Sequence, residues 1–195
     1  MAVRTSHGVP IPEHIALVAA ELFYREGIHL VGVDRVAAEA EVTKRTLYRH
    51  FRSKDELVAA ALRRSPRMSF PREGAPEERI AGAFRTMVEF VRNNAYRGCP
   101  YIIASAELAD PRHPGRAVVR DFVLKRRAWF RNRAAEAGAR DPDLLAEQLD
   151  VLFDGALASA AKRGDTAPAE AALIAAQTLL ALACASAAVP ARRAS

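Results

Sequence analysis

The stretch from Val33 to Leu62, VDRVAAEAEVTKRTLYRHFRSKDELVAAAL, constrains this chain more than any other segment. Apolar residues recur at helical spacing from Val33 to Ala40. Two residues later a new helix is predicted to open at Thr43, whose hydroxyl suits an N-cap. A third helix follows after a further short break. Two short helices around so tight a turn have the spacing of a helix-turn-helix motif.

The second of these helices is predicted to be amphipathic and basic. Leu47 and Phe51 lie about one turn apart and form an inward stripe. The segment from Thr43 to Lys54 holds five basic residues and no acidic one, with Tyr48 and His50 interleaved among them. A solvated face of an ordinary helical protein can also be basic. The combination with a helix-turn-helix favours binding to phosphates and guanine edges.

The order of the residues adds a family resemblance. The run VTKRTLYRHFRSKDELV resembles the TetR family of transcriptional regulators, also called TetR/AcrR-like. That family's signature has a small hydroxyl residue, Lys, a variable residue, Thr-Leu-Tyr, a variable residue, His or Tyr, Phe, and then Ser-Lys. The similarity starts with PEHIALVAAELFYREG, which looks like the family's first helix and its Gly stop. The resemblance implies a sequence-specific DNA-binding regulator of transcription.

The resemblance also implies residue roles in binding double-stranded DNA. The residues expected to hold phosphates are Thr43, Thr46, Tyr48, His50 and Lys54, and those expected to reach base edges are Lys44, Arg45 and Arg49. Elementary physics agrees, because Arg45 and Arg49 are i,i+4 neighbours and can enter one groove. Lys54 is expected at a helix start, where backbone amides and a cationic side chain can hold one phosphate together.

Two positions depart from the family pattern. Gly32 stands where members usually carry a Thr or Ser that caps the second helix and often touches phosphate. Arg45 stands where many members have a small residue at the base-facing position. The operator contacts of other members therefore do not transfer to this chain.

Composition excludes several classes of protein. The 195 residues carry a net charge of +6, which modestly favours a polyanionic partner. No apolar run approaches the length of a membrane span, and the N-terminus lacks a secretion signal, so a cytoplasmic protein is expected. Cys99 and Cys184 lie far apart, which predicts no disulfide and no metal site. The sequence lacks phosphate loops, metalloprotease motifs and nucleophile elbows, so we expect neither an enzyme nor a bound cofactor.

The sequence predicts an all-α fold of about nine helices in two domains. Residues 1–64 are expected to form the DNA-binding domain and residues 65–195 a helical regulatory and dimerisation domain, because prolines and a glycine interrupt helical periodicity from Ser65 to Glu78. Further helices are expected over residues 77–94, 101–109, 115–137, 142–163 and 168–188. The two terminal segments, residues 1–9 and 189–195, show no apolar pattern.

The last two helices indicate a homodimer. The final one is apolar nearly all round, so a single small core cannot bury every side of it. The helix before it carries a second face of small residues that permits close approach. The expected interface residues are Gln148, Gly155, Ser159, Leu173, Gln177 and Leu180. Resemblance implies a four-helix interface that spaces two recognition helices about one DNA turn apart on a near-palindromic operator.

Resemblance also implies a small-molecule effector that releases the protein, acting as a repressor, from its operator. Large apolar residues of the central helices are the candidate lining of the ligand pocket: Phe84, Met87, Tyr101, Phe122, Trp129 and Phe153. The alternative is a regulator that responds to no ligand, or one switched by oxidation of Cys99, which lies near Arg97 and a predicted helix start. The ligand, the operator and the direction of regulation stay open at this point.

Overall fold

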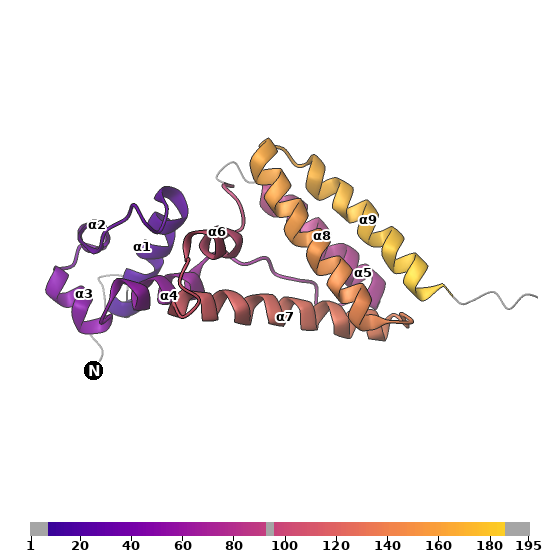
Figure 1. Cartoon of the computed structure of the whole chain (residues 1–195), viewed down its shortest axis with the longest axis horizontal. Helices are drawn as coiled ribbons and strands as arrows, with labels where there is room; N and C mark the ends of the chain where they lie inside the picture. The colour runs from indigo at the N-terminus through magenta and orange to yellow at the C-terminus, as the bar shows by residue number, and fades with distance from the viewer. Residues whose placement is uncertain (1–7, 93–95, 186–195) are drawn as a thin grey trace, which may run out of the picture. The chain divides into compact units, whose positions relative to one another are not determined.

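A computed structural model of the chain describes residues 8–92 and 96–185. These residues form nine α-helices, as the sequence predicts for an all-α fold (Figure 1). The helices divide between two compact units. The first unit comprises residues 1–67 and 94–125, and the second comprises residues 68–93 and 126–195. The helix α7, Pro114–Glu136, contributes its first half to one unit and its second half to the other.

The first unit contains the predicted helix-turn-helix. Its helices are α1 (Ile11–Glu26), α2 (Val33–Glu39), α3 (Lys44–His50), α4 (Lys54–Arg64) and α6 (Pro100–Glu107), together with the first half of α7. The helix α1 packs mainly against α4 and also contacts α2 and α3. Their shared core includes Ile15, Leu22, Val36, Leu47 and Leu57, each at most 1% exposed. Burial of these apolar side chains stabilises the unit.

Hydrogen bonds join the segment that contains α6 to the end of α1 and to the loop that follows α1 in the chain. The Glu107 carboxylate accepts a 2.7 Å hydrogen bond from the Ile28 amide and a 3.3 Å bond from the His29 amide. The guanidinium of Arg97 donates to the carbonyl oxygens of Tyr24, at 2.8 Å, and of Arg25. The Arg97 bonds satisfy carbonyl groups that the C-terminal end of α1 leaves unpaired. The segment that contains α6 belongs to this compact unit, and the division into two domains at residue 64 stays a prediction.

The second unit is built on α5 (Pro76–Arg92), α8 (Pro142–Arg163) and α9 (Ala167–Cys184). The helix α9 packs against both α5 and α8 (Figure 1). Local signals set the ends of α8, since the Asp141 carboxylate accepts from the Leu144 amide at 3.0 Å and Gly164 adopts the left-handed conformation. The predicted extension of the last helix to Ala188 lies mostly outside the described residues, and α9 ends at Cys184.

Among the described residues one helix, α9, is long and apolar enough to cross a membrane, judged by length and composition alone. Only 22% of that segment is buried within the chain. A helix that pairs with another protein surface has the same composition, so this feature alone does not indicate a membrane protein.

Candidate nucleic-acid interface

The helix α3 is fixed by one cap and two buried side chains. The Thr43 hydroxyl accepts a 3.1 Å hydrogen bond from the Thr46 amide, which confirms Thr43 as the N-cap. Its oxygen also lies 2.9 Å from the Thr46 hydroxyl. On the inward side Leu47 is fully buried and Phe51 is 8% exposed, as predicted for the apolar stripe. The opposite face of α3 is therefore turned to solvent.

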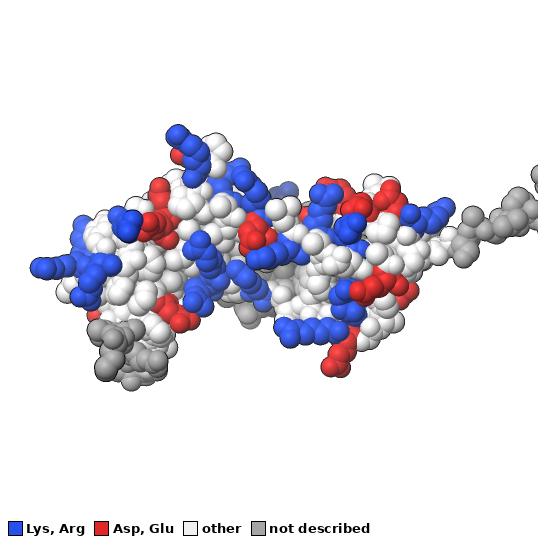
Figure 2. Space-filling model, turned by 90° about the horizontal axis from the view of Figure 1, so that it is seen from below, with Lys and Arg blue, Asp and Glu red and all other residues white. Residues whose placement is uncertain are grey.

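The predicted DNA-contacting residues lie on and beside this helix. The side chains of Thr43, Lys44, Arg45, Tyr48, Arg49 and His50 are exposed, and those of Thr46 and Lys54 are half-buried. Figure 2 shows basic side chains gathered at the end of the first unit where α3 lies. Within the described residues, Arg45 and Arg49 make no hydrogen bond or ion pair. Their guanidinium groups can thus form bidentate contacts with phosphates or with guanine edges.

Lys44 differs from these arginines because it already has an ion partner. Its Nζ atom lies 2.9 Å from Oδ1 of Asp34 on α2. The hydrogen bond and the charge of Asp34 raise the pKa of the Lys44 ammonium above its ordinary value. Lys44 therefore stays charged at physiological pH, but it shares its charge with a carboxylate that the sequence analysis did not assign to the site. The sequence could have indicated this pair, because an aspartate in the first turn of one short helix and a lysine at the start of the next can meet across a tight turn.

The start of α4 is capped by the side chain of its N-cap residue, Ser53, and by that of Glu56 in its first turn. The Ser53 hydroxyl accepts a 3.1 Å hydrogen bond from the Glu56 amide, and the Glu56 carboxylate accepts a 2.8 Å bond from the Arg52 amide. Lys54 is the first residue of α4, as expected, and its Nζ atom lies 3.5 Å from the His29 carbonyl oxygen. The position of Lys54 is compatible with a phosphate contact at a helix N-terminus.

The turn between α2 and α3 holds one residue in an uncommon conformation. Glu41 has a φ of 53°, in the left-handed region. The Val42 amide donates to the Ala37 carbonyl and the Glu41 amide to the Ala38 carbonyl, at 3.0 and 3.1 Å. This pair of bonds is a Schellman motif, which ends α2 and sets the direction of α3. The sequence offers no glycine here, so the motif was not anticipated.

Gly32, the first departure from the family pattern, is the N-cap residue of α2 and provides no side-chain hydrogen bond. A Cβ atom added at this position would meet nothing within 4 Å. Packing therefore leaves room for a Thr or Ser side chain at this position. Gly32 itself has no side-chain hydroxyl for the phosphate contact that the resemblance associates with a Thr or Ser.

The candidate pocket residues divide between the two units. In the first unit Tyr101 stacks on Phe122, with ring centroids 3.8 Å apart, and the Tyr101 hydroxyl accepts a 2.8 Å hydrogen bond from Arg67. Burial raises the pKa of Tyr101, although the Arg67 hydrogen bond opposes the shift. The other four candidates belong to the second unit, where Phe84, Met87 and Phe153 are fully buried and Trp129 is half-buried.

A buried charge cluster in the second unit was missed by the sequence analysis. The Arg126 side chain, 3% exposed, donates to Asp150 at 2.6 Å and to Asp154 at 2.8 Å. Burial acts to lower the pKa of Arg126, but the hydrogen bonds to both aspartates outweigh it and the pKa is raised. The sequence could have indicated a buried cation here, because two aspartates four residues apart on a mostly apolar helix lie on one face. This cluster lies beside Phe153, whose ring centroid is 5.3 Å from the guanidinium carbon.

Comparisons with known proteins agree with this geometry. A family model described as bacterial regulatory proteins of the tetR family matches residues 15–61. A solved structure of a chain described as a TetR transcriptional regulator from Streptomyces avermitilis is 36% identical, with a TM-score of 0.77. The alignment covers 89% of this chain and 97% of that one. A TetR-family regulator from Streptomyces coelicolor, SCO4454, is 30% identical with a TM-score of 0.82, over 90% and 96% of the two chains.

A further relative is the HTH-type transcriptional activator FasR from Mycolicibacterium smegmatis. It is 44% identical over 50 residues, which are 26% of this chain and 23% of that protein. The chain thus spans about a quarter of FasR, whereas its similarity to the two Streptomyces structures extends over nearly their whole length. On the helix-turn-helix, the nine helices that residues 8–92 and 96–185 form, and these relatives, this chain belongs to the TetR family of DNA-binding transcriptional regulators.

Proposed function

We propose that this protein is a dimeric repressor that reads a near-palindromic operator with α3. The observation that carries the proposal is the exposed, unneutralised pair Arg45 and Arg49, set one turn apart on a helix whose other face is buried. Such a pair can bind base edges in one major groove, while Thr43, Tyr48, His50 and Lys54 hold the phosphates on either side. Repression would follow from blocking a promoter in the cytoplasm and needs no contact with polymerase.

We infer that α8 and α9 form the dimer interface. Four large apolar side chains on these helices are at least half exposed, namely Leu144 at 54%, Val151 at 64%, Ile174 at 66% and Leu182 at 62%. Gly155 is exposed, with open space where a Cβ atom would be, which permits close approach of a second helix. Covering apolar surface of this kind favours association. A twofold dimer would place two α3 helices about 34 Å apart on DNA.

The proposed face differs in part from the sequence-based one. Gln148 and Gln177 are exposed, and Ser159 and Leu173 are half-buried, so all four remain members together with Gly155. Leu180 is only 5% exposed within its own chain, so we replace it by Ile174 and Leu182. Helical periodicity could not separate these alternatives, because α9 is apolar nearly all round.

We propose release by a small molecule that binds the helical region from residue 65 onward and favours a DNA-incompetent arrangement. A difference of about 3 kcal/mol in affinity between the two arrangements changes operator occupancy by roughly two orders of magnitude. One observation favours a second candidate, a regulator without a ligand. The candidate pocket residues Phe84 and Phe153 pack against each other with ring centroids 5.3 Å apart, and Phe84 also lies 6.0 Å from Phe130, so these side chains fill the core themselves. A switch at Cys99 is the third possibility, and its thiol is buried.

The test of the proposed function is selection of bound DNA from a random duplex library near physiological salt. We expect a near-palindrome whose half-sites are about one helical turn apart, and we expect Arg49→Ala to blur it. Salt-sensitive binding without any motif would instead indicate a non-specific DNA binder. The recovered operator then serves to screen small molecules that release the protein from DNA. Operator binding of the wild type and of a Cys99→Ser variant, each treated with peroxide, tests the thiol switch. A reporter gene placed behind the operator separates repression from activation.

A further inference from the structure

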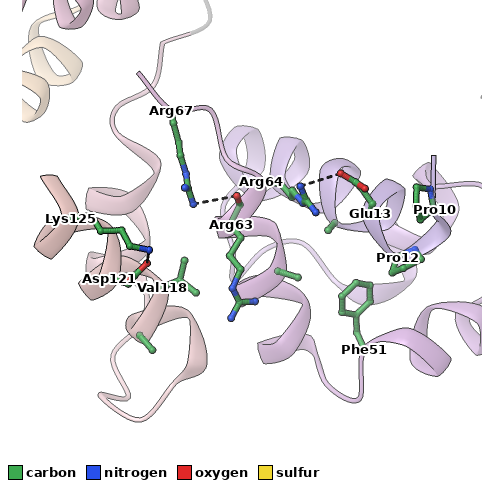
Figure 3. A pocket seen from close by; sticks show the side chains of 13 residues that line it. Pro10, Pro12, Glu13, Phe51, Arg63, Arg64, Arg67, Val118, Asp121 and Lys125 are labelled. Atoms are coloured by element: carbon green, nitrogen blue, oxygen red, sulfur yellow. Dashed lines mark hydrogen bonds and ion pairs between the residues drawn. The ribbon is translucent and has the colours of Figure 1, made fainter. Parts of the chain in front are cut away.

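A wide hollow of about 860 Å³ opens in the first unit (Figure 3). Its walls come from the start of α1, from Phe51 after α3, from the last turns of α4 and from the first half of α7. Small-molecule sites in proteins commonly have volumes of about 300–1,000 Å³. This hollow is therefore large enough for a small ligand. The charged and apolar side chains that line it determine which class of ligand can bind.

The hollow is lined by more positively than negatively charged side chains. Four cations and two carboxylates line it. The Arg64 guanidinium lies 3.1 Å from the Glu13 carboxylate, and the Lys125 ammonium lies 2.8 Å from the Asp121 carboxylate. These two pairs leave the remaining cations, Arg63 and Arg67, without a carboxylate partner inside the hollow.

Arg63 and Arg67 lie four residues apart and have different surroundings. Among the described residues Arg67 donates to neutral acceptors alone, to the Tyr101 hydroxyl at 2.8 Å and to the Arg63 carbonyl oxygen at 3.3 Å. The Arg63 guanidinium makes no hydrogen bond or ion pair within the part of the chain that the structure describes. Neither guanidinium is thus paired with a carboxylate of the hollow. Guanidinium groups bind carboxylates and phosphates with paired hydrogen bonds.

The wall of the hollow is partly apolar. Pro12, Ala16, Phe51 and Val118 contribute to it, and the last three are 3%, 8% and 7% exposed. In Figure 3 the Arg63 side chain extends from α4 and lies, in this view, between Val118 on one side and Phe51 on the other. Their apolar atoms can cover a hydrocarbon body while the arginines hold a charged head.

We propose that this hollow binds an amphipathic acid, meaning a molecule with one anionic head group on a compact apolar body. Arg63 and Arg67 hold the head group, which is a carboxylate or a phosphate, and Phe51 and Val118 cover the body. A long polyanion is a poorer match, because Glu13 and Asp121 line the same hollow and repel additional negative charge. All residues of the hollow belong to the first unit, so binding there depends neither on the dimer nor on operator reading.

The test is isothermal titration calorimetry on the full chain without DNA. The probes are 2-naphthoate, 2-naphthyl phosphate and the neutral 2-naphthalenemethanol, which share one ring system. We expect the anions to bind at least about tenfold more tightly than the alcohol, and Arg63→Gln to weaken both anions about fivefold or more. The matched control is Arg112→Gln, which removes the same charge from a side chain that is 90% exposed and outside the hollow. The tighter of the two anions identifies the head group.

A second variant tests the shape of the site. Ala117 lines the hollow and is exposed, so Ala117→Phe fills the space without disturbing the core, and we expect it to abolish binding of both anions. Thermal melting by circular dichroism verifies that both variants fold. The proposal is overturned if neither anion binds, if the alcohol binds equally well, if Arg63→Gln behaves like Arg112→Gln, or if Ala117→Phe binds as the wild type does.

Discussion

The ion pair between Lys44 and Asp34 places a carboxylate within the surface that we propose faces DNA. Asp34 is a surface residue whose side chain is 73% exposed, and its oxygen atoms lie 2.9 and 3.1 Å from the Lys44 ammonium. An exposed ion pair of this kind adds little to folding stability. Its effect on binding is larger, because a phosphate must compete with Asp34 for Lys44 and is repelled by the same carboxylate.

The first prediction is that Asp34→Asn increases affinity for the operator. Removing the carboxylate releases Lys44 for a phosphate, and we expect a gain of about three- to tenfold at low salt that shrinks as salt rises. The measurement is fluorescence anisotropy over a range of salt concentrations. The control is Glu39→Gln, which removes the same charge from α2 at a carboxylate paired with Arg35 instead. An equal gain in both variants would attribute the effect to net charge and not to Lys44.

The second prediction separates base contacts from phosphate contacts. Arg45→Ala and Arg49→Ala should each cost about 1–3 kcal/mol on the selected operator and relax base preference. Lys54→Ala should weaken binding to all sequences alike, because a phosphate contact carries no sequence information. Competition of each variant against operator and scrambled duplexes measures both effects. If Arg45→Ala changed neither affinity nor preference, Arg45 would not be a base-reading residue.

At the scale of elements, the geometry of the helix-turn-helix depends on the turn at Glu41. An L-residue in the left-handed conformation costs about 1–2 kcal/mol, and glycine avoids that cost. The remaining bonds of the turn support the strained residue: both amides of the Schellman motif are paired, and the His14 ring lies 3.3 Å from the Ala40 carbonyl oxygen. The strain is thus local and can be removed without altering the bonds around it.

The third prediction is that Glu41→Gly stabilises the first unit. The gain should be about 0.5–1 kcal/mol, because relief of strain exceeds the added entropy of the unfolded chain. Urea denaturation followed by circular dichroism measures it. Glu41→Ala is the control, since it removes the same carboxylate but keeps the unfavourable backbone conformation. Equal stabilisation by Ala and Gly would show that the charge, and not the backbone, is responsible.

Most elements of this fold could be predicted because their ends are marked locally. Thr43, Asp141 and Gly164 determine helix ends through their own side chains or backbone preferences, and Thr43 is the N-cap that the sequence predicts. The pairing of α6 with the end of α1 could not be predicted in this way. Glu107 and its partner amide at Ile28 are separated by 79 residues, and neither has a sequence pattern that points to the other.

At the scale of the whole molecule, the exposed apolar residues of α8 and α9 require a partner or leave an unfavourable surface in water. Val151 and Ile174 are each about two-thirds exposed, at 64% and 66%. Their apolar area, with that of Leu144 and Leu182, is the surface on which the proposed dimer depends. Operator affinity should depend on it too, because a monomer can bind only one half-site.

The fourth prediction is that a charge on this face converts the dimer into a monomer. Val151→Glu, Ile174→Glu and Gly155→Arg should each give a species near 21.2 kDa in analytical ultracentrifugation and lose most operator affinity. Leu30→Glu is the matched control, because Leu30 is 86% exposed but belongs to the first unit. A dimer that persists in all three variants would place the interface elsewhere.

The sequence by itself determined the family, the helices and the amphipathic basic face of α3, because these follow from spacing and capping within a few residues. The tertiary structure decided the grouping of α6 with the first unit, the pairing of Lys44 with Asp34 and of Arg126 with Asp150 and Asp154, and the burial of Leu180. It also divided the six pocket candidates between two units. The physical reason is that such contacts join residues distant in the chain, and the free energy of each depends on neighbours that no local pattern specifies.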